Sequence, residues 1–295
     1  MCGIVGLFLK TDRLRPQLGD LMTDMLITMT DRGPDSAGLA IYSDSAAFKL
    51  TVQSDAPDLV FPQLADWLGK NAKGASLRAL STHAVISTPV ELAESLPQEM
   101  QAAFPDLRIM SGGASMEVYK EVGLPRDVAT RFGLREMAGT HGIGHTRMAT
   151  ESAVTTDGAH PFSTGDDQCL VHNGSLSNHN ALRRKLARED VTVSSQNDSE
   201  VAAAYLTWKM REGANLGEAL EMGLKDLDGF YTFVVGTKNG FGVLRDPIAC
   251  KPAVLAETED YVAFGSEYRA LVGLPEIDTA RVWEPEPATV YFWER

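Results

Sequence analysis

Cys2 is the residue of this sequence whose position best suits it to act as a nucleophile. Removal of Met1, which a small second residue permits, would leave a thiol and a free α-amino group on one residue. Such an amine titrates near ~7.7–8.0 and a thiol near ~8.5, so the amine can accept the thiol proton around neutrality. N-terminal amines activate hydroxyl and thiol nucleophiles in this way. The alternative is that Cys2 is a small buried hydrophobic residue at the start of a strand, because free cysteines are often buried.

Clustered histidines raise the question of a zinc site, since five of the six lie within 39 residues: His141, His145, His160, His172 and His179. A helix would place His141 and His145 on one face, but the glycine-rich, alternating sequence around them predicts a strand. No HExxH motif and no cysteine pair accompanies them. We therefore expect no metal site and no cofactor. His145 is expected to be structural, and His160 to be a turn residue or a substrate contact.

The composition is that of an ordinary globular protein, with 44% hydrophobic and 23% charged residues among 295. The net charge of −13 argues against nonspecific binding of nucleic acid. Three cysteines without a CxxC pair fit a reducing compartment. The apolar run near the start is too short for a membrane span and lacks a basic segment before it. We expect a cytoplasmic protein without a membrane segment.

Hydrophobic periodicity predicts strands at both ends of the chain with helices between them, which favours stacked sheets covered by helices in an α+β fold. Residues 39–42 and 48–52 are expected to form a strand pair joined by a polar turn. Residues 55–136 have a different texture and predict a small α/β insertion. The other expected elements are strands at 2–9, 141–147, 168–172, 230–236, 241–245, 253–258, 261–265 and 288–292, and helices at 18–29, 178–188 and 200–211.

Seven short motifs, in order along the chain, resemble those of the class II glutamine amidotransferases. They are CGIVG at 2–6, RGPDS at 32–36, GHTRMAT at 144–150, HNG at 172–174, NDSE at 197–200, DGFY at 228–231 and RDP at 245–247. Each motif is weak alone, but seven in the family's order form a strong signal. The resemblance implies a four-layer αββα N-terminal-nucleophile hydrolase sandwich over residues 2–295, with residues 55–136 inserted within it. It also implies an enzyme that hydrolyses the side-chain amide of L-glutamine.

The resemblance assigns catalytic roles to Cys2, Asn173 and Gly174. Amide hydrolysis passes through a tetrahedral oxyanion, which needs donors already aimed at it. The side-chain amide of Asn173 and the backbone N–H of Gly174 would be two such donors, with Cys2 as the nucleophile. The alternative for Asn173-Gly174 is a two-residue hairpin turn.

The resemblance also implies a substrate site for a free amino acid. Arg147 would bind the α-carboxylate, which a guanidinium can grip with two hydrogen bonds. Asp198 would bind the α-ammonium group, and Thr150 and His160 would add further substrate contacts. The alternatives are a surface ion pair for Arg147 and a helix N-cap for Asp198. Arg32 is expected to support the strand of the nucleophile.

Departures from the family's pattern and the long insertion refine the resemblance. Met148 and Glu151 stand where the glucosamine-6-phosphate synthase type has tryptophan and histidine. The insertion before Arg147 is more similar to the glutamate synthase branch, so the chain resembles the free-standing glutaminase subunit of an N-methylglutamate synthase or a similar complex. Because the motifs take up most of the chain, we expect a larger synthase subunit as the partner that receives the ammonia.

Two other functions remain open from the sequence. One is a non-catalytic, glutamine-sensing subunit that uses the pocket to regulate a synthase complex. The other is an amidase for a different γ-glutamyl or acyl amide. The pairing of Arg147 with Asp198, which suits a free amino acid, favours glutamine.

Overall fold

A computed structural model describes residues 2–149 and 153–295 of the chain. Its largest sheet has seven antiparallel strands, with β1 at the centre. In spatial order they are β15 (Arg281–Trp283), β13 (Val254–Glu257), β14 (Tyr261–Gly265), β1 (Gly3–Leu9), β8 (His141–Arg147), β2 (Ser36–Tyr42) and β7 (Met116–Val122). Every residue of β1, β2 and β8 is buried, so both faces of this sheet are covered at its centre.

A second, five-stranded sheet packs face to face on the first. It consists of β16 (Thr289–Glu294), β12 (Gly240–Arg245), β11 (Gly229–Gly236), β10 (Gln168–Leu176) and β9 (Phe162–Gly165). Apolar side chains from both sheets fill the space between them, among them Ile4 and Phe8 of β1 and Val171 of β10. Alternate residues of each strand point into this layer, as they must in a sheet.

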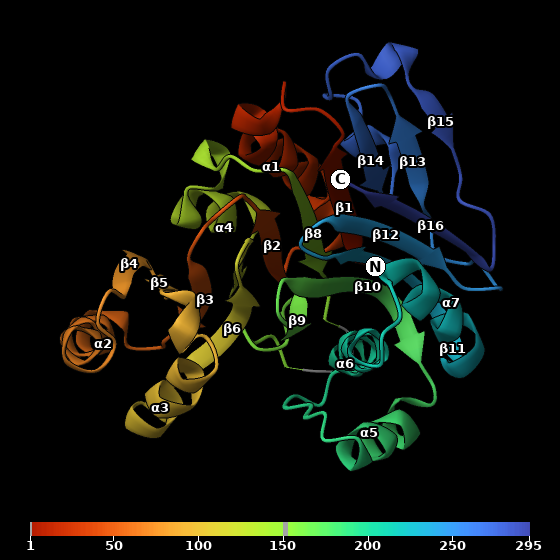
Figure 1. Cartoon of the computed structure of the whole chain (residues 1–295). Helices are drawn as coiled ribbons and strands as arrows, with labels where there is room; N and C mark the ends of the chain where they lie inside the picture. Colours follow the sequence, from red (N-terminus) through yellow and green to blue (C-terminus); the bar gives the residue numbers. More distant parts are fainter. Residues whose placement is uncertain (1, 150–152) are drawn as a thin grey trace.

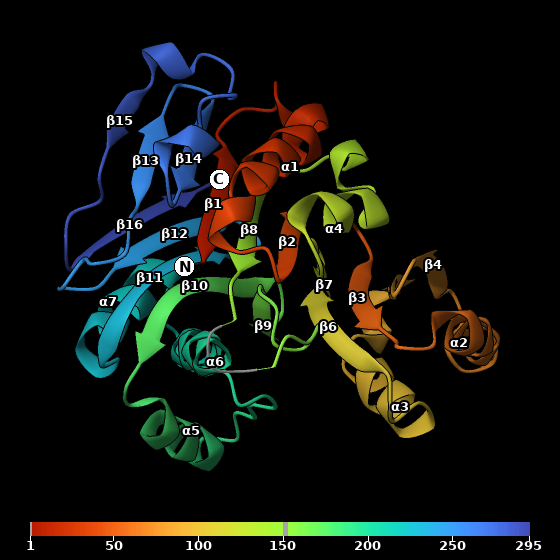
Figure 2. The same ribbon diagram turned by 180° about the vertical axis from the view of Figure 1, so that it is seen from behind.

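Helices cover the outer face of each sheet (Figures 1 and 2). On the seven-stranded sheet lie α1 (Leu18–Thr28) and α4 (Pro125–Phe132), whose apolar residues share one core with it. On the five-stranded sheet lie α5 (His179–Arg188), α6 (Asp198–Arg211) and α7 (Leu216–Asp226). The expected four-layer αββα sandwich is therefore confirmed.

A smaller four-stranded sheet projects from this sandwich, at the lower left in Figure 1. It contains β4 (Ser76–Leu80), β5 (His83–Thr88), β3 (Phe48–Gln53) and β6 (Arg108–Gly113), and it shares its own apolar core with α2 (Pro57–Asn71) and α3 (Ser95–Ala103). The carboxylate of Asp167, before β10, accepts hydrogen bonds from the backbone N–H groups of residues 114–116. This contact fastens the base of the small sheet to the five-stranded one. As a division of the chain, the insertion over 55–136 stays a prediction.

The predicted pairing of strands 39–42 and 48–52 is wrong, although both strands exist. β2 pairs with β7 and β8 in the large sheet, whereas β3 pairs with β5 and β6 in the small one. Residues 43–47, of which the first three are polar, thus cross from one sheet to the other. A short polar link between two strands is equally compatible with a hairpin, and only the distant strands that flank β2 on both sides decide against it.

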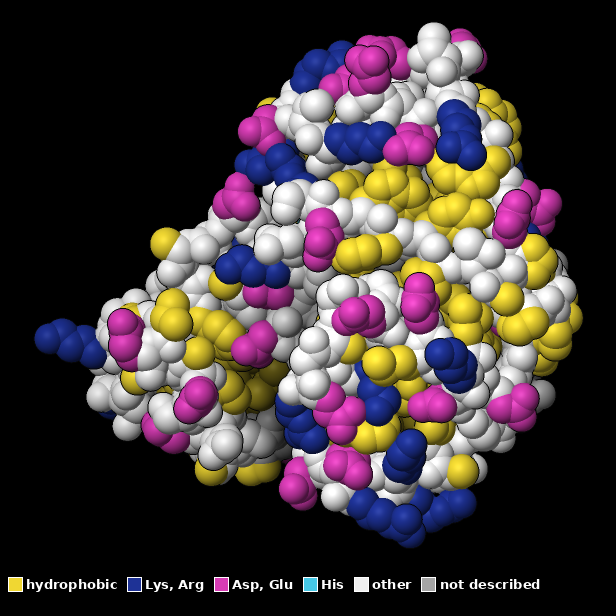
Figure 3. Space-filling view, turned by 45° about the vertical axis from the view of Figure 1, so that its right-hand side comes forward, with side chains coloured by type: hydrophobic (Ala, Val, Ile, Leu, Met, Phe, Trp, Pro, Cys, Tyr) yellow, Lys and Arg dark blue, Asp and Glu magenta, His cyan; other side chains and the backbone are white. Residues whose placement is uncertain are grey.

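Acidic and basic side chains are interspersed over the face shown in Figure 3. Among the described residues, no helix is long and apolar enough to cross a membrane.

Candidate active site

Cys2 is partly exposed and immediately precedes β1, the central strand of the large sheet. The strand is tightly held at this end. The N–H of Ile4 donates to the Ser266 hydroxyl (2.9 Å), and a Cβ on Gly3 would lie only 2.7 Å from Thr146 Oγ1 and from Met29 Cβ. Cys2 is thus not a buried core residue, because part of its surface is exposed to solvent. The strand that follows it is nevertheless held in a fixed position.

Arg32 lies beside Cys2, as its expected supporting role requires. It belongs to a short 3-10 helix, Thr30–Arg32, and is only 8% exposed. Its Nε donates to the backbone oxygen of Cys2 (2.9 Å), and its Nη1 forms an ion pair with Glu267 (2.6 Å). Arg32 holds the pKa of Glu267 below its usual value, mainly through this hydrogen bond. The guanidinium therefore ties the start of β1 to the loop that follows β14.

Asn173 reaches the same oxygen from the other sheet, 171 positions away in sequence. Strand alternation turns Cys169, Val171 and Asn173 toward the seven-stranded sheet, and Asn173 Nδ2 donates to the Cys2 oxygen at 3.2 Å. The side chain is 3% exposed. The hairpin-turn alternative is wrong, because Asn173 and Gly174 lie within β10, opposite Thr232 and Tyr231 of β11.

Gly174 has a backbone conformation that a larger residue would strain, with φ of +152°. A Cβ built there would lie 2.0 Å from the Phe230 carbonyl oxygen and 2.7 Å from the Tyr231 Cα. Both atoms belong to the neighbouring backbone, which cannot rotate away as a side chain can. Glycine is therefore required here for the close approach of β10 and β11 as well as for the conformation.

Asp198 is the first residue of α6, and its interpretation as the N-cap is wrong. The cap is Asn197, whose side chain accepts a hydrogen bond from the Ser199 N–H (2.9 Å). Asp198 Oδ2 accepts instead from the backbone N–H of Leu176 (2.8 Å), near the end of β10. Its carboxylate thus joins α6 to the strand that carries Asn173, and its side chain stays 22% exposed.

Arg147 ends β8 next to the nucleophile strand. Gly3 pairs with Thr146, so the next residue, Arg147, falls opposite Cys2 in the antiparallel register. Arg147 is 7% exposed and its Nη1 donates to the Ala153 carbonyl (3.3 Å), so it is not a surface residue. Thr150, the other substrate residue expected from this motif, lies outside the described residues.

Three histidines and one serine connect these elements behind the site. The rings of His145 and His160 stack at 4.1 Å, and His145 Nε2 donates to the His172 carbonyl (3.0 Å). His160 Nε2 and His172 Nδ1 both contact the Ser199 hydroxyl, at 2.8 and 2.9 Å. At least one of these two rings must donate to the serine oxygen, because the hydroxyl has a single hydrogen, for which Asp198 Oδ1 at 3.4 Å is a further acceptor. From the sequence, Ser199 is a possible helix cap and has no assigned role in the site, although it directly follows Asp198 in the NDSE motif.

Burial keeps these histidines neutral. It lowers the pKa of His145 to about 3 and of His172 to about 4, and it lowers the pKa of His160 well below 6.5. No group of histidine, cysteine or carboxylate residues in the described part of the chain has the arrangement of a metal site. The histidine cluster instead links β8, β10 and the start of α6, on which Arg147, Asn173 and Asp198 lie.

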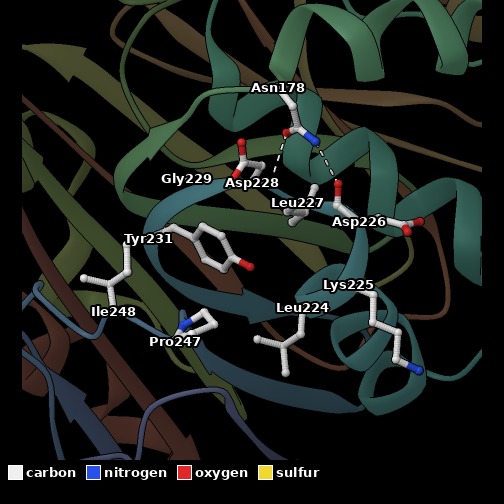
Figure 4. A pocket seen from close by; sticks show the side chains of 10 residues that line it. All are labelled: Asn178, Leu224, Lys225, Asp226, Leu227, Asp228, Gly229, Tyr231, Pro247 and Ile248. Carbon is white, nitrogen blue, oxygen red and sulfur yellow. Dashed lines mark hydrogen bonds between the residues drawn. The ribbon is translucent and has the colours of Figure 1, made fainter.

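A cavity of about 500 Å³ opens next to the DGFY motif. In Figure 4 its side chains come from the end of α7, the start of β11, the loop after β12 and the residue before α5. Tyr231 lines it together with Asn178, Asp226, Asp228 and Ile248. Among the described residues, neither Cys2 nor Arg147, His160 or Asp198 lines it, so it is separate from that part of the candidate active site.

The fold matches that of solved glutamine amidotransferases. The glutamine phosphoribosylpyrophosphate amidotransferase from B. subtilis superposes with a TM-score of 0.63 and 18% identity, over 99% of this chain and 47% of that chain. A second structure, titled as the allosteric regulatory enzyme of purine biosynthesis, gives a TM-score of 0.64 at 19% identity with the same coverage. This chain therefore spans about half of each, and the likeness defines the N-terminal-nucleophile hydrolase fold.

Sequence relatives define the family. A glutamine amidotransferase domain family matches residues 145–273. The glutamine amidotransferase-like protein GlxB of Rhizobium meliloti is 65% identical over 100% of this chain and 98% of its own length. A putative glutamine amidotransferase of Methanothermobacter thermautotrophicus is 33% identical, with both chains covered completely. The chain belongs to the glutamine amidotransferase family, and the expected class of enzyme is confirmed.

Proposed function

We propose that this protein hydrolyses L-glutamine to glutamate with Cys2 as the nucleophile and passes the ammonia to a partner synthase subunit. The observation that carries the proposal is the hydrogen bond from Asn173 Nδ2 to the Cys2 oxygen at 3.2 Å. This bond brings the side-chain amide of the HNG motif to Cys2, the proposed N-terminal nucleophile. Arg32 donates to the same oxygen, so the backbone of the nucleophile is held from two sides.

In the proposed reaction, the α-amine of Cys2 accepts the thiol proton as the sulfur attacks the amide carbon of glutamine. The carbonyl oxygen becomes an oxyanion that the Asn173 amide and the Gly174 N–H stabilise. The proton then passes to the leaving nitrogen, and ammonia departs from a γ-glutamyl thioester. Water adds to the thioester through a second oxyanion, which releases glutamate and restores the thiol.

In the same proposal, Arg147 binds the α-carboxylate and Asp198 the α-ammonium group of the substrate. The support is positional: Arg147 falls opposite Cys2 in the strand register, and Asp198 is bonded to the strand of Asn173. His160 is 5% exposed and bonded to Ser199, next to Asp198, so its contribution to the substrate site acts through that neighbour. Thr150 stays a predicted substrate contact.

Replacing Cys2 with alanine tests the nucleophile. We expect Cys2→Ala to lose glutaminase turnover while it still binds glutamine, because the residues proposed to bind the substrate are untouched. Glutamate release and calorimetric binding of glutamine measure the two properties, and intact mass shows whether Met1 is removed. Full turnover in Cys2→Ala contradicts the mechanism, and a retained Met1 favours a glutamine-sensing subunit instead.

The partner is tested separately, because free ammonia would escape unless a second active site received it. We expect affinity purification from the native cell to recover the protein in a stable complex with a larger synthase subunit. Glutaminase activity should rise in that complex. A protein that is monomeric in the native cell and fully active alone contradicts this part of the proposal.

A further inference from the structure

Lys120 is a buried cation that belongs to none of the seven motifs. It lies in β7, is 5% exposed, and stands opposite Gly38 of β2. Its ammonium donates to the backbone carbonyls of Ala159 (2.9 Å) and Asp157 (3.4 Å) and lies 4.5 Å from the centre of the Phe162 ring. Within the described part of the chain its ammonium forms no ion pair, so carbonyl dipoles and an aromatic face balance its charge.

The carbonyls that Lys120 binds belong to residues 153–160, which connect the two proposed glutamine-binding groups. At the start of this segment, the Ala153 carbonyl accepts from Arg147. At its end, His160 is bonded to Ser199, the neighbour of Asp198. The path of the segment therefore affects the surroundings of both the carboxylate-binding and the ammonium-binding residue.

Other contacts hold the same segment against β7 and β6. The Thr156 hydroxyl donates to Glu121, the residue after Lys120, and the Asp157 carboxylate pairs with Arg108 of β6 (3.2 Å). The Asp157–Arg108 pair joins side chains that are exposed to solvent, where such pairs contribute little, whereas the Thr156–Glu121 bond is partly buried. The contact from the buried ammonium to carbonyl oxygens is charge-assisted and shielded from water, so it is a stronger restraint than the exposed Asp157–Arg108 pair.

The end of the segment is closely packed beside Lys120. A Cβ on Gly38 would lie 2.1 Å from the His160 carbonyl and 2.6 Å from the Lys120 Cβ. The backbone at His160 thus lies directly on β2 beside the lysine. Burial lowers the pKa of Lys120 to about 8, with the carboxylates of Asp157 and Glu200 acting in the opposite direction, so the ammonium is mainly protonated at neutral pH.

We propose that Lys120 is a positioning residue for glutamine binding, which fixes residues 157–160 so that Arg147 and Asp198 are preorganised for the substrate. The proposal rests on the proposed glutaminase function. It gives β7 a role in substrate affinity, although no side chain of this strand is among the proposed catalytic residues.

The test is Lys120→Met, which keeps most of the aliphatic stem and removes the ammonium. We expect the KM for glutamine to rise about tenfold with kcat within twofold of the wild type, because a loss of ground-state positioning that persists in the transition state appears in KM. The matched control is Lys49→Met. Lys49 is also a buried lysine, but its ammonium contacts Ser43 and Glu117 and nothing in the 153–160 segment. We expect its KM to be unchanged.

Backbone hydrogen exchange is the second readout and does not depend on catalysis. The Ala159 N–H donates to the Thr156 carbonyl (3.1 Å), and its protection should fall in Lys120→Met and not in Lys49→Met. If Lys120→Met does not fold, Lys120→Gln keeps a neutral donor on a side chain one bond shorter and should give an intermediate KM.

A KM within twofold of the wild type in folded Lys120 variants, or a fall in kcat alone, overturns this inference while leaving the glutaminase proposal intact. If the wild-type protein and its partner complex hydrolyse no glutamine, the proposed function fails. Hydrogen exchange then decides the inference: unchanged protection of Ala159 refutes the restraint by Lys120, and lost protection supports it.

Discussion

Replacement of Asn173 by alanine separates catalysis from structure at the proposed oxyanion site. The Cys2 carbonyl accepts two hydrogen bonds, one from Asn173 and one from Arg32 Nε (2.9 Å). Asn173→Ala removes the first and leaves the second, so the carbonyl remains satisfied. The structural cost is then about 1 kcal/mol for one hydrogen bond, plus the small cavity left by a side chain that is 3% exposed.

The expected catalytic cost is larger. Removal of one side-chain oxyanion donor lowers kcat by about 10²–10³, or about 2.7–4 kcal/mol of transition-state stabilisation. The KM should change little, since the donor acts on a charge that exists only in the transition state and the intermediates. We therefore expect Asn173→Ala to be folded, to bind glutamine, and to turn over at most about 1% as fast as the wild type.

Steady-state glutamate release gives kcat and KM, and urea unfolding gives the stability. The matched control is Ser266→Ala, which removes the acceptor of the Ile4 N–H (2.9 Å) and leaves that buried donor without its side-chain partner. We expect this control to cost about 1–3 kcal/mol of stability and to lower kcat by less than tenfold. A kcat for Asn173→Ala within threefold of the wild type, or an equal fall in Ser266→Ala, refutes the assignment of Asn173 as an oxyanion donor.

Two further predictions concern stability. Gly174→Ala should lower the free energy of unfolding in urea more than Gly123→Ala does. Both glycines have a positive φ, which costs a residue with a Cβ about 1–3 kcal/mol. Only at Gly174 would the Cβ also meet neighbouring backbone, 2.0 Å from the Phe230 carbonyl oxygen. Equal costs would show that the β11 backbone moves aside freely. The histidine cluster should make the protein acid-sensitive. Below pH ~6.5 the histidines of the unfolded state take up protons, whereas the buried rings of the folded state stay neutral because their pKa values are lowered. The free energy of unfolding should therefore fall by about 1 kcal/mol per histidine between pH 6.5 and 5.5. A flat urea-unfolding profile over this range contradicts the burial of neutral imidazoles.

Local patterns predicted the secondary structure well where a single strand or helix carried its own signal. The apolar run at residues 2–9 is β1, and the alternating 141–147 is β8. The pairing of residues 39–42 with 48–52 failed because the polar link between them carries no information about which sheet each strand joins. Asp198 was assigned as a possible cap because it has the right residue type, but Asn197, one position earlier, makes the capping hydrogen bond.

The class of the protein can be read from its amino-acid sequence, because seven motifs in order identify a family without any knowledge of their contacts. The sequence also named Cys2, Asn173 and Arg32 as members of one site. The tertiary structure alone decided how they meet: Asn173 lies within a strand of one sheet and reaches a carbonyl on the other. The contacts of Ser199 and Lys120 are also visible only in the tertiary structure. The Ser199 hydroxyl lies between the imidazoles of His160 and His172, and the Lys120 ammonium binds the Ala159 carbonyl, so both contacts join segments that are distant in the sequence. Periodicity and local motifs report which face of an element is apolar, whereas these contacts arise only when the layers pack.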